Sequence, residues 1–88
     1  MKVRWCAEKS RVLKYQRGVS FEEMMKQRMI AIVDHPQRPH QFKMLFEYQG
    51  YVWAVPFVVQ GDEAFLKTMY PCRKYTKLFR REVGNEED

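Results

Sequence analysis

Hydrophobic and polar positions are most regularly arranged between residues 42 and 70. The segments "FKMLFEY", "YVWAVPFVV" and "EAFLKTMY" are separated only by "QG" and "QGD", and breaks this short fit hairpins. The pattern therefore predicts a three-stranded antiparallel meander. Its middle strand is apolar on both faces, which places it inside the sheet. Pro56 cannot donate a ladder hydrogen bond, so it is expected to mark a bulge or the end of pairing to one neighbour.

Between residues 2 and 18 the pattern predicts a short strand followed by a helix. Residues 2–5 alternate as a strand does, and "CAEKSRVLKYQR" spaces its apolar residues among charged ones before Gly18. Glycine commonly follows the last residue of a helix, because it adopts a left-handed backbone without a steric cost. The helix is therefore expected to end at Gly18.

A second helix is predicted directly after this stop. Ser20 can cap the first free amides while Glu23 reaches back to Ser20, which is the capping-box arrangement. The apolar residues of this helix are Phe21, Met24, Met25 and Met29. The segment "MIAIVDHP" is either the end of this helix or a strand, and its β-branched residues favour a strand that begins near Ile30.

These elements predict an α+β domain. An antiparallel sheet of about four strands carries two N-terminal helices packed on it, and a short basic helix follows at the C-terminus. That last helix begins either with Pro71 as its first residue or with Thr76 as its cap. Residues 1–81 are expected to form a single domain, and the acidic segment 82–88 a disordered tail.

Composition agrees with one folded domain. The 88 residues are 45% hydrophobic and 15% aromatic, which is enough for a modest packed core. Cys6 and Cys72 lie far apart and form no CxxC motif, so neither a disulfide framework nor a zinc site is indicated. The sequence has no signal-peptide pattern and no apolar run of membrane-spanning length. We therefore expect a cytoplasmic protein that contacts no membrane and binds no metal.

The charge of the chain is unevenly distributed. The net charge is +5, but four of the eleven acidic residues lie in residues 82–88, so residues 1–81 carry a net charge of +9. A basic globular surface is typical of proteins that bind nucleic acids or acidic protein segments. The alternative is that the surplus of lysine serves only solubility.

The densest basic cluster lies in "MYPCRKYTKLFRRE", residues 69–82. Its basic residues are Arg73, Lys74, Lys77, Arg80 and Arg81. The chain has no phosphate-binding glycine loop, paired-carboxylate site, HExxH motif or nucleophile elbow, so most cofactor-dependent and hydrolytic chemistries are excluded and no cofactor is expected. The cluster fits RNA cleavage without a metal ion, a phosphate-binding surface, or a solvated helix face.

Metal-free RNA cleavage needs a base for the 2′-hydroxyl, an acid for the leaving 5′-oxygen, and cations for the developing charge. The arginines of the cluster would supply the cations. Lys74 or Lys77 would transfer protons if crowding by like charges favours a neutral lysine. The loop "DHPQRPHQ" offers His35 and His40 as possible general acids or bases, although a loop histidine is more often simply exposed. Aromatic side chains beside the cations would stack on bases, and these are Tyr70 and Tyr75.

Several segments resemble, in their order and spacing, the BrnT-like toxins of type II toxin-antitoxin systems. These toxins are small basic ribonucleases related in fold to RelE and ParE. The segments are an N-terminal Trp, "EKSRVLKYQRGVSFEE", a "DHP" element, "YVWAVPFV" and "LKTMYPCRKYTK", and together they span residues 5–77. Within the last segment, "RKYTK" is similar to the family pattern S-R-(K/R)-A-T-K.

The resemblance implies a growth-inhibiting endoribonuclease whose partners are RNA and a cognate antitoxin encoded in an adjacent gene. It implies that the catalytic positions are Arg73, Lys74 and Lys77, with Thr76 as the helix cap. Where the family commonly has "KHG", this chain has Gln16-Arg17-Gly18. Cleavage by a histidine at that point is therefore excluded. The nucleic-acid-binding positions are then Arg17, Tyr70, Tyr75, Arg80 and Arg81.

The departure at Arg17 keeps a second hypothesis open. In that hypothesis the chain is a non-catalytic module of the same fold that binds nucleic acid or an acidic antitoxin segment. ParE relatives poison gyrase instead, which is a third alternative, because a fold does not fix a target. RNA fragments formed in a metal-free incubation would exclude the non-catalytic module.

Overall fold

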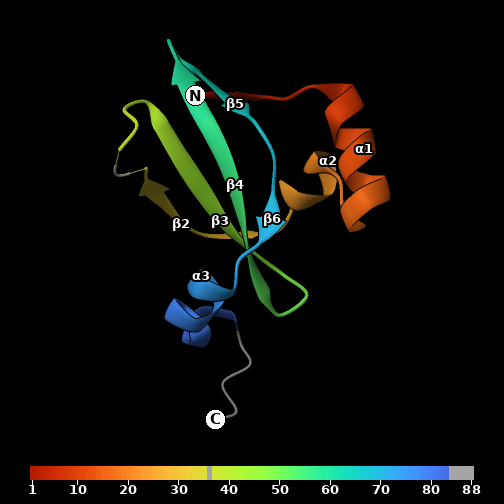
Figure 1. The fold of residues 1–88 in the computed structure, drawn as a ribbon, viewed down its shortest axis with the longest axis vertical. Helices are drawn as coiled ribbons and strands as arrows, with labels where there is room; N and C mark the ends of the chain where they lie inside the picture. The colour runs from red at the N-terminus through yellow and green to blue at the C-terminus, as the bar shows by residue number, and fades with distance from the viewer. Residues whose placement is uncertain (36, 84–88) are drawn as a thin grey trace.

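The computed structural model describes residues 1–35 and 37–83, and Figure 1 shows their arrangement. The elements follow in the order β1 (Lys2–Arg4), α1 (Ala7–Arg17), α2 (Phe21–Met24), β2 (Arg28–Asp34), β3 (Gln41–Tyr48), β4 (Tyr51–Gln60), β5 (Glu63–Leu66), β6 (Tyr70–Pro71), α3 (Arg73–Leu78) and the 3₁₀ helix η1 (Arg80–Val83). The predicted α+β class is confirmed. The first two residues of the predicted tail belong to η1, and the rest of it, residues 84–88, lies outside the described residues.

Within the described residues the strands form one six-stranded sheet. Their order is β1-β5-β4-β3-β2, and β6 lies beside β4. The strands β2 to β5 are antiparallel neighbours, so the predicted meander is confirmed. Gln49 and Gly50 join β3 to β4 with φ values of 54° and 74°, the positive values that a type I′ turn requires. The strand β1 pairs with β5 in parallel, so the sheet is mixed rather than purely antiparallel.

Pro56 lies where the third strand of the meander is interrupted. The strand β5 pairs with residues 57–60 of β4, and β6 pairs with residues 53 and 54. Between them, the Lys67 backbone N–H donates a hydrogen bond to the Pro56 carbonyl at 2.9 Å. Proline has no N–H with which to continue a ladder. Pairing to β5 therefore ends beside Pro56, as predicted, and the single strand expected over residues 63–70 is two short strands.

The helices α1 and α2 cover one face of the sheet, where the larger core lies. Leu13 of α1 and Phe21 and Met24 of α2 are buried there against the strands. Gly18 follows α1 with a φ of 85°, as its predicted role as the helix stop requires. The predicted capping box between Ser20 and Glu23 is present.

The second helix is shorter than its apolar residues predicted. It ends at Met24, and Met29 lies in β2, where its side chain is 45% exposed. The physical reason is that β2 begins to pair with β3 at Arg28, opposite Glu47. Met29 is therefore part of a strand and not of a buried helical stripe.

The helix α3 packs on the opposite face of the sheet. A smaller core of Leu45, Val52 and Ala54 is buried there, and Tyr75 and Phe79 pack against it. In β4 the odd-numbered residues face the larger core, and Val52 and Ala54 face the smaller one on the opposite side, so the alternation predicted for this strand is confirmed. The sheet therefore separates α3 from α1 and α2, as their positions in Figure 1 illustrate.

Candidate nucleic-acid interface

The start of α3 is fixed to the sheet by hydrogen bonds with β4. The Cys72 backbone N–H donates to the Val52 carbonyl at 2.8 Å. The Thr76 hydroxyl donates to the Cys72 carbonyl at 2.8 Å and accepts from the Val52 N–H at 2.9 Å. These contacts hold a six-residue helix that is too short to be stable alone.

The helix begins at neither of the residues that the sequence suggested. Its first residue is Arg73, and Cys72 stands at the cap position. Pro71 pairs with Trp53 as part of β6, which keeps its backbone extended. Thr76 lies inside the helix, where its hydroxyl returns to the Cys72 carbonyl four residues earlier.

The predicted catalytic cations lie together on α3. The side chains of Arg73, Lys74 and Lys77 are exposed, and Arg73 and Lys77 are four residues apart, so they share one face of the helix. Among residues 1–35 and 37–81, the ion pairs formed by cations all lie elsewhere, on Arg4, Arg11, Lys14 and Arg28. The cations of α3 are thus available to an anionic ligand.

The arginines that follow the helix extend this surface. Arg80 and Arg81 are exposed in η1. Together with Lys77 and Leu78 they line an open hollow of about 450 Å³. Three cations around one hollow form a positive site that a bound anion would stabilise.

Tyr75 links α3 to a lysine that the sequence did not single out. Its half-buried ring packs beside Phe79, with 6.4 Å between ring centroids. The Lys74 Nζ lies 5.7 Å from the centroid of the Tyr75 ring, and the Lys43 Nζ lies 5.9 Å from it. Lys43 of β3 therefore adds a cation to this surface. Lys43 is two residues before Leu45, so the sequence predicts that both side chains lie on the same face of the strand. The sequence does not show that α3 packs on that face.

Tyr70 has a more structural position than predicted. It lies in β6 opposite Ala54 and packs, half-buried, against the smaller core. Its backbone position in the sheet keeps the chain extended until α3 begins. Tyr70 is thus a neighbour of the basic cluster, and Tyr75 is the tyrosine that contacts its cations.

The structure does not bring the two histidines to α3. The β2–β3 loop lies at the opposite end of the sheet from α3 (Figure 1). The His40 carbonyl accepts a hydrogen bond from the Val59 N–H, seven residues along β4 from Val52, or about 23 Å at strand spacing. His35 stays within its own loop, where its Nδ1 accepts from the Gln37 N–H at 3.3 Å.

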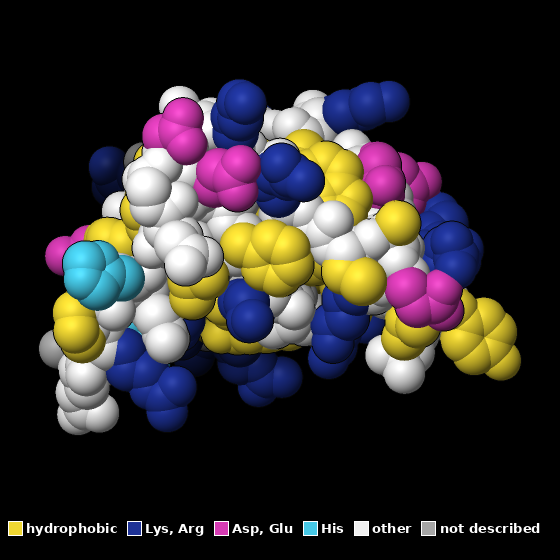
Figure 2. Space-filling view, turned by 90° about the horizontal axis from the view of Figure 1, so that it is seen from above, with side chains coloured by type: hydrophobic (Ala, Val, Ile, Leu, Met, Phe, Trp, Pro, Cys, Tyr) yellow, Lys and Arg dark blue, Asp and Glu magenta, His cyan; other side chains and the backbone are white. Residues whose placement is uncertain are grey.

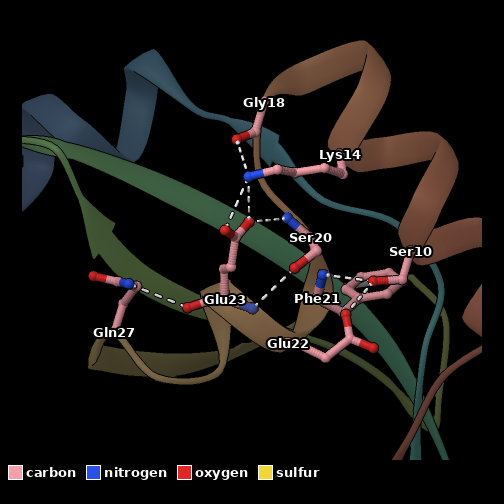
Figure 3. A network of polar contacts seen from close by, with 8 residues as sticks. All are labelled: Ser10, Lys14, Gly18, Ser20, Phe21, Glu22, Glu23 and Gln27. Atoms are coloured by element: carbon pink, nitrogen blue, oxygen red, sulfur yellow. Dashed lines mark hydrogen bonds and ion pairs between the residues drawn. The ribbon is translucent and has the colours of Figure 1, made fainter.

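Arg17 is also separated from the cluster. It lies in the last turn of α1, exposed, on the other side of the sheet from α3. The segment around it has a structural role, which Figure 3 shows in detail. The Lys14 Nζ donates to both carboxylate oxygens of Glu23 at 2.9 and 3.0 Å, and Glu23 accepts from the Ser20 N–H at 2.9 Å. This contact raises the pKa of Lys14 and lowers that of Glu23.

A second part of the same network joins α1 to the start of α2. The Ser10 hydroxyl donates to Glu22 at 2.6 Å and accepts from the Phe21 N–H at 2.9 Å, and the Trp5 indole donates to Glu22 at 3.0 Å. These hydrogen bonds lower the pKa of Glu22. The hydrogen bond from Ser10 has the largest effect, and that from the Trp5 indole is among the smaller ones. The polar groups of the segment "RGVSFEE" are thus engaged in hydrogen bonds with one another, with α1 and with Trp5. The segment therefore stabilises the junction between the two helices.

Neither a metal centre nor a membrane span is evident in the part of the chain that the structure describes. No group of three or more His, Cys, Asp or Glu side chains there is placed to hold a metal ion. Over those same residues, each helix is too short or too polar to cross a bilayer. Both cysteines are free thiols.

Comparison with known proteins supports the fold. No protein-family model matches the chain, and no curated protein sequence matches it. The crystal structure of the ribonuclease toxin BrnT of Brucella abortus is similar, with a TM-score of 0.52. The two sequences are 19% identical, and the match covers 82% of this chain and 96% of that chain. The chain therefore has a BrnT-like fold, as the resemblance of its segments predicted.

Proposed function

We propose that this protein is the toxin of a type II toxin-antitoxin system, an endoribonuclease that cleaves RNA without a metal ion. The observation that carries the proposal is the exposed cluster of cations on α3, held against the sheet by Thr76. The likeness of the fold to a ribonuclease toxin supports the same reading. Its partners would be RNA and a cognate antitoxin encoded in an adjacent gene, and its place the cytoplasm.

In this proposal the cations of α3 act on the scissile phosphate. Arg73 and Lys77, on one face of the helix, would bind the phosphate oxygens and stabilise the charge that develops on them during attack by the 2′-hydroxyl. Lys74 or Lys77 would transfer the protons, since neither histidine lies near the helix. Arg80 and Arg81 would hold a neighbouring phosphate at the hollow beside Lys77.

Expression in a bacterium tests this function. The parent protein should arrest growth, and the triple substitution of Arg73, Lys74 and Lys77 by alanine should relieve the arrest while the protein stays folded. A matched control replaces Lys9, Arg17 and Lys26, three exposed cations of the α1–α2 side, by alanine. The proposal is wrong if the α3 variant is as toxic as the parent or if the control variant relieves the arrest equally.

A non-catalytic module is the second candidate, and one observation favours it. The structure brings neither histidine to the cluster on α3, since the His40 carbonyl accepts its hydrogen bond about 23 Å away along β4. Such a module would bind RNA or an acidic antitoxin segment with an affinity that falls steeply as salt rises. It would leave RNA intact in a metal-free incubation, which separates it from the toxin. A poison of gyrase would likewise leave RNA intact but would stop DNA supercoiling.

A further inference from the structure

The face of the sheet that carries α3 is only partly covered. The helix packs over Leu45, Val52 and Ala54, and the sheet continues beyond it toward the other end of the strands. There, Gln41, Val58, Phe65 and Arg4 stand directly opposite one another across four strands. Residues paired in this way point to the same face of a sheet. Phe65 and Arg4 therefore share a face with α3.

Phe65 is an exposed aromatic side chain bordered by cations. Its side chain is 39% exposed and lies outside both cores. The Lys67 Nζ lies 5.5 Å from the centroid of the Phe65 ring, and Arg4 is its directly paired neighbour. One carboxylate, that of Glu63, lies 3.3 Å from Arg4. The arginine side chain still has 60% of its surface exposed.

The same combination of an aromatic ring and a cation occurs where α3 meets the sheet. Tyr75 has Lys43 beside its ring. Lys43 pairs with Pro56, and the carbonyl of Pro56 accepts the N–H of Lys67. The two lysines are thus two strand spacings apart, or about 10 Å. A single surface runs from α3 through Lys43 and Lys67 to Phe65.

Basic side chains are accordingly not confined to α3. Figure 2 looks at the end of the molecule away from α3 and shows lysine and arginine side chains on several sides of it, some of them along the lower edge of the view. Acidic side chains lie among those of the upper half and at both sides. A ligand of negative charge that reaches α3 also meets Lys43, Lys67 and Arg4 on this face of the sheet.

We propose that this open sheet face binds single-stranded RNA, with a base stacked on Phe65 and phosphates held by Lys67 and Arg4. The cations alone would suit any polyanion, whereas an exposed aromatic ring between them suits a ligand that offers flat bases beside phosphates. A duplex keeps its bases stacked inside and an acidic peptide has none, so neither would use the ring. The choice of RNA rests on the proposed function, which places the reacting phosphate at α3.

Fluorescence anisotropy with a labelled single-stranded 2′-O-methyl RNA tests this inference, because the blocked 2′-hydroxyl prevents cleavage. Phe65→Leu in the full chain should weaken binding about tenfold, and Phe65→Tyr should keep most of the affinity. The matched control is Tyr15→Leu, which removes a 92% exposed aromatic side chain from α1 and should change nothing. Circular dichroism melts establish that each variant is folded.

Binding by Phe65→Leu as tight as the parent's would overturn the inference, and so would a failure of the parent to bind this RNA. An equal loss for a poly-glutamate peptide or an RNA duplex would overturn it as well, since those ligands offer no free base. The outcome is independent of cleavage. If binding depends on Phe65 but unmodified RNA is not cleaved, the binding face is supported and the nuclease activity is not. If RNA is cleaved but binding does not depend on Phe65, the nuclease activity is supported and the binding face is not.

Discussion

The hydroxyl of Thr76 lies 2.9 Å from the backbone nitrogen of Val52 and accepts its hydrogen bond. The same hydroxyl donates to the Cys72 carbonyl at 2.8 Å, so one side chain closes the first turn of α3 and ties it to β4. Arg73, Lys74 and Lys77 stand on either side of Thr76 in the sequence. Their positions relative to the sheet therefore depend on this contact.

Replacing the hydroxyl should destabilise the protein. Thr76→Val keeps the shape of the side chain but leaves the partly buried Val52 N–H without its acceptor, which we expect to cost about 1–3 kcal/mol. Thr76→Ser keeps the hydroxyl and should lose less. Urea denaturation followed by circular dichroism measures the difference, and equal stability of the two variants would contradict the assigned contact.

Ser10 has a comparable role at the junction of α1 and α2. Its side chain is buried and serves both the Glu22 carboxylate and the Phe21 N–H. Ser10→Ala should lower the free energy of unfolding by about 1–3 kcal/mol, because the buried Phe21 N–H loses its acceptor. Ser10→Thr keeps a hydroxyl and serves as the comparison. If alanine is tolerated as well as threonine, the hydroxyl contributes nothing to the junction.

Stability should fall as the solution is acidified through the pKa of Glu22. The folded protein holds that pKa below its ordinary value of 4.5, first through the Ser10 hydrogen bond. A carboxylate with a lowered pKa contributes its stabilisation above 4.5 and loses it as the pH falls through the folded value. Glu22→Gln should therefore flatten the loss of stability below pH 4.5. A slope in Glu22→Gln equal to that of the parent would contradict the prediction.

The histidines provide a test of where the chemistry takes place. The His40 carbonyl is hydrogen-bonded to β4 about 23 Å along the strand from Val52, to which α3 is attached. His35→Ala and His40→Ala should therefore cleave RNA at the parent's rate. Arg73→Ala should lose most of the cleavage under the same conditions. A loss of a hundredfold or more in either histidine variant, with the fold intact, would place the reaction in the β2–β3 loop.

Local signals in the sequence predicted much of this fold. The Ser20–Glu23 capping box, the stop at Gly18 and the two-faced alternation of β4 each depend on residues close together in the chain, and each is present. The interruption at Pro56 was also predictable, because the missing N–H is a property of the residue itself.

Features that depend on distant partners were not predictable. The parallel pairing of β1 with β5 joins residues about sixty positions apart, and the start of α3 is set by Trp53 and Val52. The side of the sheet chosen by α3 has no local signal. Lys43 was missed for that reason, and Arg17 was grouped with cations from which the sheet separates it.

Cleavage of a labelled RNA by the purified protein in EDTA tests the proposed endoribonuclease most sharply. We expect fragments ending in a 2′,3′-cyclic phosphate, the product of attack by the neighbouring 2′-hydroxyl. Cleavage should be at least a hundredfold slower when Arg73, Lys74 and Lys77 are replaced by alanine. Intact RNA after incubation with the parent, or equal cleavage by the triple variant, would contradict the proposed activity.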